Sequence, residues 1–240
     1  MTLGIITACY KADYFMVKAT CASIRYYLPE VPICVIVDGD FSITEIEELY
    51  NVQTLHTSEF KHSILREICP GSPRTKLASI WESPFDEFLC IDSDIVFWGN
   101  VLSKINLKLY DFVILSNLLS SIKDKENIKQ FFFDTDKLNN IDPDFQWLNR
   151  PFFCAGAFAA KKDCLDLDTY IRLEEFSRKN PGTFNFAEQG IFNYMVLKAA
   201  DQNTLSISVA DLQYIVVDHS KEKSRKRFFS PSMFPPKNIK

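Results

Sequence analysis

Two aspartates that directly follow an apolar run are well suited to hold a metal ion. Asp92 and Asp94 come after residues 88–91, which are apolar enough for a buried strand, and a second apolar run follows them. Removing two carboxylates from water is unfavourable unless a partner compensates. Mg²⁺ or Mn²⁺ does so, because hard cations prefer carboxylate oxygens and accept phosphate oxygens in their remaining positions. The alternative is a buried pair satisfied by backbone amides and by Arg or Lys side chains.

The D-x-D spacing alone carries little weight. Among 18 aspartates chance alone produces about one such pair, yet the sequence has five, beginning at positions 38, 92, 134, 142 and 166. The last three lie in polar or helical surroundings typical of solvated faces, and they lack the Gly and terminal Glu of an EF-hand. Asp38 ends an apolar run, so it could position a nucleotide base or a ribose.

The elements around these aspartates predict an α/β fold. Apolar runs at residues 3–9 and 33–37 flank a segment with apolar residues at helical spacing, which predicts a strand–helix–strand unit. Further strands are expected at residues 52–55, 85–91, 95–97, 112–115, 158–160, 205–209 and 214–217. Helices are expected at residues 72–81, 163–178 and 188–199, and a short one with capping residues Ser42 and Glu45. Residues 120–144 predict a helix plus a long loop, a candidate lid or acceptor loop.

This alternation predicts a mainly parallel, doubly wound sheet with helices on both faces, which binds ligands at the carboxyl ends of its strands. Ala8, Cys9 and Tyr10 follow the first strand, where backbone groups can bind a base and Tyr10 can stack on it. Tyr10 could equally be a core or surface aromatic. Neither G-x-G-x-x-G nor a P-loop pattern occurs, and only seven glycines are present. Dinucleotide enzymes and P-loop NTPases are therefore disfavoured.

Composition limits the classes of partner and compartment. The 27 basic and 31 acidic residues give a net charge of −4, which disfavours nucleic acid as a partner. Seven scattered cysteines and the absence of a basic leader or a long apolar segment predict a reduced, cytoplasmic protein. We expect one domain over residues 1–219 and a basic, aromatic tail over 220–240. The tail could close over a diphosphate, rest peripherally on the inner face of an anionic membrane, or be disordered.

Four segments resemble GT-A glycosyltransferases of the glycogenin and bacterial galactosyltransferase type, which is family 8-like. Residues 74–81, R-T-K-L-A-S-I-W, resemble that family's T-K-L-x-x-x-W segment, and residues 92–94 resemble its D-x-D. Residues 153–158, F-C-A-G-A-F, resemble its F-N-[AS]-G-V strand. Residues 188–193, E-Q-G-I-F-N, resemble its D-Q-G-I-L-N helix start. Order and spacing agree, so the resemblance implies the GT-A, nucleotide-diphospho-sugar transferase fold.

The resemblance also implies roles for individual residues. Metal ligands are expected at Asp92, Asp94 and His219, and catalytic roles at Glu188, which could stabilise an oxocarbenium-like transition state, and Gln189, which could orient the anomeric centre. Contacts with the donor nucleotide sugar are expected at Ala8, Cys9, Tyr10, Asp38, Arg74, Lys76, Ser93 and Gly156. Each of these residues also has an ordinary structural interpretation, such as a first-turn acid for Glu188 or a solvated base for Lys76.

The sequence departs from the family pattern at three places. Glu188 replaces an Asp, Cys154 and Ala155 replace the Asn segment, and Ser220 to Glu222 follow His219 where Gly belongs. From the four matching segments we nevertheless expect a retaining glycosyltransferase that uses a UDP-sugar and depends on Mn²⁺ or Mg²⁺. Its acceptor would be a glycan or a lipid-linked molecule in polysaccharide biosynthesis. The alternatives are a nucleotidyltransferase of similar architecture and a sugar-nucleotide-binding protein that has lost turnover.

Overall fold

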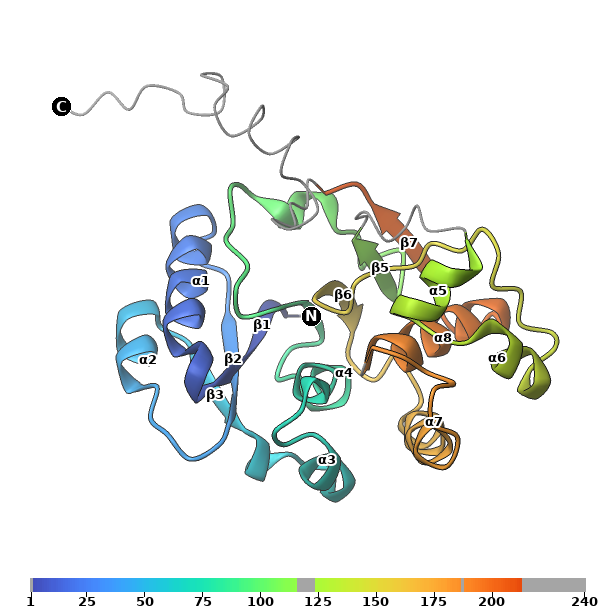
Figure 1. The fold of residues 1–240 in the computed structure, drawn as a ribbon. Helices are drawn as coiled ribbons and strands as arrows, with labels where there is room; N and C mark the ends of the chain where they lie inside the picture. The colour runs from blue at the N-terminus through green and yellow to red at the C-terminus, as the bar shows by residue number, and fades with distance from the viewer. Residues whose placement is uncertain (1, 116–123, 187, 213–240) are drawn as a thin grey trace.

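A seven-stranded mixed sheet with the strand order β3-β2-β1-β4-β6-β5-β7 forms the centre of the protein (Figure 1). The computed structural model describes residues 2–115, 124–186 and 188–212. The strands are β1 (Leu3–Tyr10), β2 (Ile33–Asp38), β3 (Gln53–His56), β4 (Glu87–Ile91), β5 (Phe112–Leu115), β6 (Ala157–Lys161) and β7 (Ile207–Ala210). The predicted α/β class and mainly parallel sheet are confirmed.

Strand β6 interrupts the parallel order of the sheet. The first four strands in the sheet, β3 to β4, pair in parallel, and β5 pairs in parallel with β7. By contrast, β6 runs antiparallel to both β4 and β5, with Ile91 opposite Ala157 and Ile114 opposite Phe158. The segment that precedes β6 therefore lies at the carboxyl end of β4, beside Asp92. The sequence did not indicate this reversal, because an apolar strand gives no sign of its direction.

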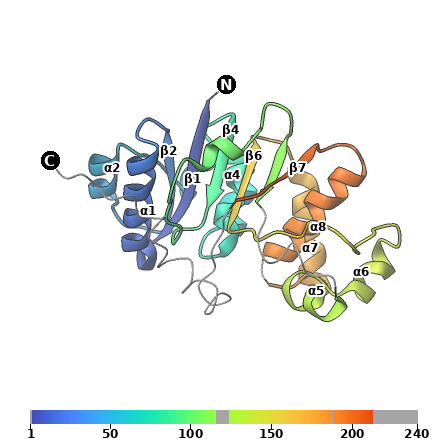
Figure 2. The ribbon, with the colours of Figure 1, turned by 90° about the horizontal axis from the view of Figure 1, so that it is seen from above.

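Helices cover both faces of the sheet, as expected, because successive residues of each buried strand point to opposite faces (Figure 2). On one face lie α1 (Tyr14–Tyr27) and α2 (Thr44–Tyr50). The other face packs against α3 (Ser63–Ile68), α4 (Ser79–Glu82), α5 (Lys125–Phe131), α6 (Thr135–Ile141), α7 (Leu167–Lys179) and α8 (Glu188–Asp201). No helix of the described ranges is long and apolar enough to span a bilayer.

Several local predictions differ from the structure. Residues 72–81 form a 3₁₀ turn over Pro73–Lys76 and then the short α4, because Pro73 starts a turn in which the Ser72 hydroxyl accepts a hydrogen bond from Arg74 N at 3.2 Å. Helix α3 was not predicted. Residues 95–97 form no strand, since Phe97 N donates to Ser23 Oγ on α1 at 3.0 Å instead of to a neighbouring strand.

The ends of other elements also shift. Helix α2 begins at Thr44, with Ile43 as its N-cap residue, so the predicted capping by Ser42 and Glu45 is wrong; the Ser42 hydroxyl accepts from Thr44 N at 3.2 Å. The region 120–144 contains two helices, α5 and α6, capped by Asp124 and Asp134. The expected strand at 214–217, His219 and the tail 220–240 lie outside the described residues, as do residues 116–123.

Candidate active site

A pocket opens where β1 and β4 end at the carboxyl edge of the sheet. This is the edge at which ligands bind in open α/β sheets. The ends of β1 and β4 and the residues that follow them form part of its wall. The loop and 3₁₀ turn over residues 71–76 form the rest. The lining residues are Ala8, Tyr10, Asp13, Gly71, Ser72, Pro73, Lys76, Ile91, Asp92 and Ser93.

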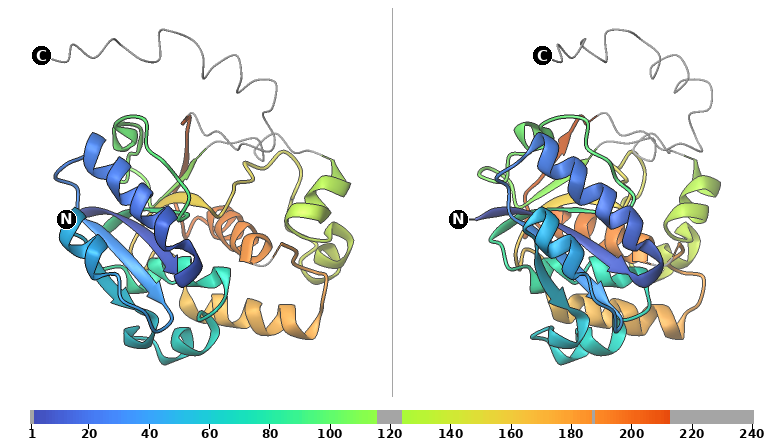
Figure 3. Two further views of the ribbon diagram at one scale, coloured as in Figure 1. Left: turned by 60° about the vertical axis from the view of Figure 1, so that its left-hand side comes forward. Right: turned by 90° about the vertical axis from the view of Figure 1, so that its left-hand side faces the viewer.

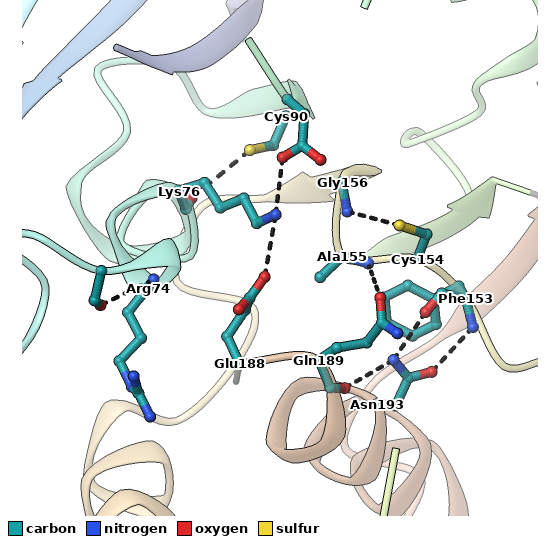
Figure 4. Close-up of polar contacts among 12 residues, drawn as sticks. Arg74, Lys76, Cys90, Phe153, Cys154, Ala155, Gly156, Glu188, Gln189 and Asn193 are labelled. Carbon is teal, nitrogen blue, oxygen red and sulfur yellow. Dashed lines mark hydrogen bonds and ion pairs between the residues drawn. The ribbon is translucent and has the colours of Figure 1, made fainter. Parts of the chain in front are cut away.

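Lys76 lies between two carboxylates at this pocket. Its Nζ is 2.8 Å from Asp92 Oδ1 and 3.1 Å from Glu188 Oε1 (Figure 4). Its side chain is 14% exposed and that of Glu188 only 8%. Burial alone would lower the pKa of Lys76, yet the charges of Asp92 and Glu188 outweigh it and raise the pKa above its ordinary value. The site therefore holds a permanent, fixed cation.

Asp38 fixes the loop that carries Lys76. Its Oδ2 accepts a hydrogen bond from Gly71 N at 2.8 Å and lies 2.8 Å from Thr75 Oγ1. The Tyr10 hydroxyl donates to the carbonyl oxygen of Ser72, and burial is the main reason that the pKa of Tyr10 rises to about 12. Asp38 is buried and does not line the pocket. The structure thus places it behind the loop, whereas Tyr10 does line the pocket.

Arg74 anchors the same turn on its other side. Its Nε donates to Glu174 Oε1 on α7 at 2.6 Å, and the Tyr170 hydroxyl donates to that oxygen at 3.0 Å. Tyr170 also stacks on Trp81, with ring centroids 5.0 Å apart. The guanidinium of Arg74 extends away from Lys76 toward α7 (Figure 4). Among the described residues Arg74 is therefore a link between the turn and α7, and it does not line the pocket.

Gly156 allows the segment before β6 to lie close to Asp92 at the end of β4. Asp92 N donates to the Gly156 carbonyl oxygen at 2.7 Å. A Cβ on residue 156 would lie 2.2 Å from Asp92 Oδ2 and 3.3 Å from Cys154 Sγ. The absence of a side chain at this position therefore leaves the space that the Asp92 carboxylate occupies.

The start of α8 holds the segment before β6 through side-chain amides. Gln189 Oε1 accepts from Ala155 N at 3.3 Å (Figure 4). Its Nε2 donates to the Phe131 carbonyl oxygen at 3.1 Å. Asn193 bonds both the N–H and the carbonyl of Phe153, at 3.0 and 2.9 Å. Of the two residues predicted to be catalytic, Glu188 reaches the Lys76 ammonium, whereas the amide of Gln189 binds backbone groups.

The remaining predicted site residues are placed as follows. Cys9 is fully buried on the α1 side of β1, where burial raises the pKa of its thiol to about 12. Ser93 lines the pocket, and its carbonyl oxygen accepts from Thr20 Oγ1 at 2.6 Å. Asp94 is exposed, and His219 lies outside the described ranges.

The donor set fits a hard divalent ion only in part. Asp92 lines the pocket and its Oδ1 already binds Lys76, whereas Asp94 is exposed and is not among the lining residues. Within the residues that the structure describes, no group of three His, Cys, Asp or Glu side chains is arranged to hold a metal. A metal here would need phosphate or water oxygens as further ligands, which suits Mg²⁺ and Mn²⁺.

Sequence reasoning missed Asp13 and the loop residues Gly71, Ser72 and Pro73 as pocket residues. The signal for Asp13 is its place three residues after Tyr10, the end of β1. Ser72 and Pro73 were assigned to the predicted helix over 72–81, although Gly71 and Pro73 are two residues apart and typical of a turn.

The overall fold is similar to that of several solved glycosyltransferases. The galactosyltransferase LgtC in complex with donor and acceptor sugar analogues is 14% identical with a TM-score of 0.60, over 96% of this chain and 81% of LgtC. GlyE of Streptococcus pneumoniae is 11% identical with a TM-score of 0.56, over 95% and 47%.

Glucosyl-3-phosphoglycerate synthase of Mycobacterium tuberculosis, solved with Mn²⁺, UDP and glucosyl-3-phosphoglycerate, is 14% identical with a TM-score of 0.50, over 93% and 76%. No family model and no curated protein matches the sequence. At these identities the similarity establishes the fold alone: this chain has the GT-A fold, as the four sequence segments predicted.

Proposed function

We propose that this protein is a glycosyltransferase that moves a sugar from a nucleotide-diphosphate donor, a UDP-sugar, to a glycan or glycoconjugate acceptor. The observation that carries the proposal is the Lys76 ammonium, fixed between Asp92 and Glu188 at a pocket on the carboxyl edge of the sheet. The GT-A fold supports it, since LgtC and the synthase were solved with donor or UDP ligands.

Lys76 is suited to stabilise the leaving group. Cleavage of the donor's glycosidic bond leaves negative charge on the diphosphate, and a cation that is already in place stabilises this charge without reorganisation. Because the pKa of Lys76 is raised, the side chain stays protonated at neutral pH and acts by its charge, not by giving up a proton. Asp92 and Glu188 fix its position from two sides.

Glu188 is the residue best placed to act on the sugar. It begins α8, is buried, and forms an ion pair with Lys76. Such a carboxylate would accept hydrogen bonds from sugar hydroxyls and stabilise positive charge on an oxocarbenium-like transition state. Gln189 contributes through the Ala155 backbone, which it holds beside Gly156. The retaining outcome is part of the proposal and is supported by the resemblance of this segment to D-Q-G-I-L-N.

A divalent ion is also part of the proposal. Asp92 and Asp94 would hold Mn²⁺ or Mg²⁺, with the third position left to His219 or to the donor's own oxygens. When bound, the ion would supply Lewis-acid stabilisation of the diphosphate. The Mn²⁺ and UDP bound by the mycobacterial synthase support this assignment.

The decisive experiment measures UDP release and sugar transfer by the full chain with UDP-glucose, UDP-galactose and Mn²⁺. Lys76→Ala should reduce turnover by about 100-fold or more, because a charge that stabilises the leaving group is lost. Lys104→Ala removes an exposed lysine that does not line the pocket and serves as the control, with unchanged turnover. Equal activity of both variants would contradict the proposal.

The products separate the competing functions. Formation of UDP-sugar from UTP and a sugar phosphate would identify a nucleotidyltransferase. Binding of UDP-sugar by calorimetry without release of UDP, over a panel of glycan and lipid-linked acceptors, would identify a binding protein without turnover.

A further inference from the structure

Helix α7 carries one buried carboxylate. The side chain of Glu174 is 6% exposed. The other charged residues of this helix are all exposed, and they are Asp168, Arg172, Glu175, Arg178 and Lys179. Moving a carboxylate out of water without a partner is strongly unfavourable. Glu174 therefore needs specific partners inside the protein.

These partners come from α7 itself and from a distant part of the chain. Arg74 Nε donates to Glu174 Oε1 at 2.6 Å, and the Tyr170 hydroxyl donates to the same oxygen at 3.0 Å. Tyr170 is buried and stacks on Trp81 of α4, whose indole N–H donates to the Leu165 carbonyl oxygen at 2.7 Å. The contact with Tyr170 thus fixes the Glu174 carboxylate, and the guanidinium of Arg74 is its counter-ion.

The ion pair of Arg74 and Glu174 is suited to fix the position of the 3₁₀ turn Pro73–Lys76. Replacing both members of a buried ion pair by uncharged residues often leaves stability unchanged, whereas removing one member is strongly unfavourable. Such a pair therefore favours the one arrangement in which its two elements meet. A turn of four residues is too short to hold its place through its own hydrogen bonds. Its position depends on contacts with other elements.

Those contacts attach the turn to two parts of the molecule. Thr75 binds Asp38 of β2 at 2.8 Å, and the Tyr10 hydroxyl of β1 donates to the carbonyl oxygen of Ser72, just before the turn. These two contacts attach the turn to the first strands of the sheet. The ion pair of Arg74 attaches the same turn to α7.

Helix α7 in turn packs against α8, which begins with Glu188. In the left-hand view of Figure 3, α7, in light orange, lies below α8 and beside the turquoise segment that contains the turn and α4. Lys76 follows Arg74 by two residues, and its Nζ is 3.1 Å from Glu188 Oε1. The ion pair of Arg74 and Glu174 therefore joins the two elements whose side chains meet at the pocket.

We propose that Glu174 is a positioning residue, which acts through Arg74 to set the distance between the Lys76 ammonium and Glu188. This inference rests on the proposed function, in which Lys76 stabilises the leaving diphosphate. Without the ion pair, the turn would stay attached to β1 and β2 but could move relative to α8. Lys76 would then keep Asp92 and lose Glu188. A misplacement of about 1 Å can lower the rate of an enzyme by about 100-fold.

A variant without either charge separates positioning from stability. Arg74→Met combined with Glu174→Gln leaves no unpaired buried ion and keeps an acceptor for the Tyr170 hydroxyl. We expect its melting temperature to stay close to that of the parent chain and its turnover to fall about 10-fold. Arg172→Met combined with Glu175→Gln makes the same changes at exposed residues of α7. This control should change neither quantity.

The same pair of substitutions in a Lys76→Ala chain tests whether Glu174 acts through Lys76. Turnover is measured as UDP release from UDP-glucose and UDP-galactose with Mn²⁺. If Glu174 positions Lys76, Arg74→Met with Glu174→Gln should cause no further loss once Lys76 is absent. A pair that served only to stabilise the fold would lower turnover by the same factor in both chains.

Crystal structures of the parent chain and of the Arg74→Met, Glu174→Gln variant provide a measurement that does not depend on activity. The distance from Lys76 Nζ to Glu188 Oε1, 3.1 Å in the parent chain, should exceed the ion-pair limit of about 4 Å in the variant. The contact of Lys76 with Asp92 should remain.

Three results would overturn the proposal. These are full turnover of the Arg74→Met, Glu174→Gln variant, an equal loss with and without Lys76, and an unchanged distance between Lys76 and Glu188. A parent chain that releases no UDP from either donor would contradict the proposed function instead. The crystallographic distance would still decide whether Glu174 positions Lys76.

Discussion

At the scale of single residues, the site depends on distances that only the fold sets. Asp92, Lys76 and Glu188 were all chosen from the sequence, because each stands in a segment with a recognisable pattern. Their ion pairs were not predicted, since 112 positions separate residues 76 and 188. The same limit applies to Arg74 and Asp38, whose polar groups could equally have faced the donor. In the structure they bind Glu174 and the Gly71 loop.

The space that Gly156 leaves for the Asp92 carboxylate can be tested by substitution. Gly156→Ala should reduce sugar transfer at least 10-fold while the chain stays folded, because the added Cβ would lie 2.2 Å from Asp92 Oδ2 and displace that carboxylate from Lys76. Steady-state UDP release and the melting temperature are the two measurements. Gly99→Ala, where nothing lies within 4 Å of the new Cβ, is the matched control. Full activity of the Gly156 variant would show that Asp92 can move without consequence.

At the scale of elements, long apolar segments were predicted well and short ones poorly. Helices α1, α7 and α8 and strands β1, β2 and β4 have enough periodic residues to be recognised. The 3₁₀ turn over Pro73–Lys76 and the six-residue α3 do not. The turn is held by the hydrogen bond from Thr75 to Asp38, and the residue before α3, His62, donates its backbone N–H to Glu82. The turn is the element that carries Lys76, so the missed element was also the functional one.

Gly190 in the first turn of α8 lies close to the backbone of Phe132, and this close approach can be tested by substitution. Gly190→Ala should lower the melting temperature by several degrees or prevent folding, although alanine improves helix propensity by about 1 kcal/mol. The reason is that a Cβ on residue 190 would lie 1.9 Å from the Phe132 carbonyl oxygen and 2.9 Å from that of Asn185, both backbone atoms. Thermal unfolding followed by circular dichroism measures the effect. An unchanged or higher melting temperature would mean that α8 can shift away from Phe132.

At the scale of the whole molecule, the sequence identified the α/β class, the helices on both faces and the edge that carries the pocket. It did not identify the strand order, because pairing partners are chosen by packing among distant segments. Neither the direction of β6 nor the contact between α7 and the 3₁₀ turn produces a local pattern in the amino-acid sequence. The fold class was therefore predictable from the sequence, whereas the strand order, the direction of β6 and the contact between α7 and the 3₁₀ turn were not.

The stability of the whole molecule should depend on pH in a defined direction. A hydrogen bond from Ser206 is the main cause that lowers the pKa of Asp111, and a hydrogen bond from Lys129 is the main cause that lowers that of Asp134. Both carboxylates therefore stabilise the fold fully above the unfolded value near 3.9. That stabilisation is lost as the pH falls through the lowered folded values.

We expect the urea midpoint to stay constant from pH 7 to about pH 5 and to fall progressively below it. Asp134→Asn should weaken this dependence, because an asparagine can still cap α6 but does not titrate. Urea unfolding followed by circular dichroism at pH 7, 5, 4 and 3 measures both. A steeper fall for the variant than for the parent chain would refute the assignment.

The antiparallel strand β6 has a consequence for synthesis. Strands β4 and β5 are neighbours in sequence but are separated in the finished sheet by residues 157–161. A nascent chain that has left the ribosome as far as β5 can pair β1 with β4, yet β5 must stay unpaired with β4 until the 46 further residues up to the end of β6, Leu115 to Lys161, have emerged. Premature pairing of β4 with β5 would exclude β6, so a pause in translation at the point where residues up to Leu115 have emerged should favour misfolding, whereas a pause once residues up to Lys161 have emerged should not.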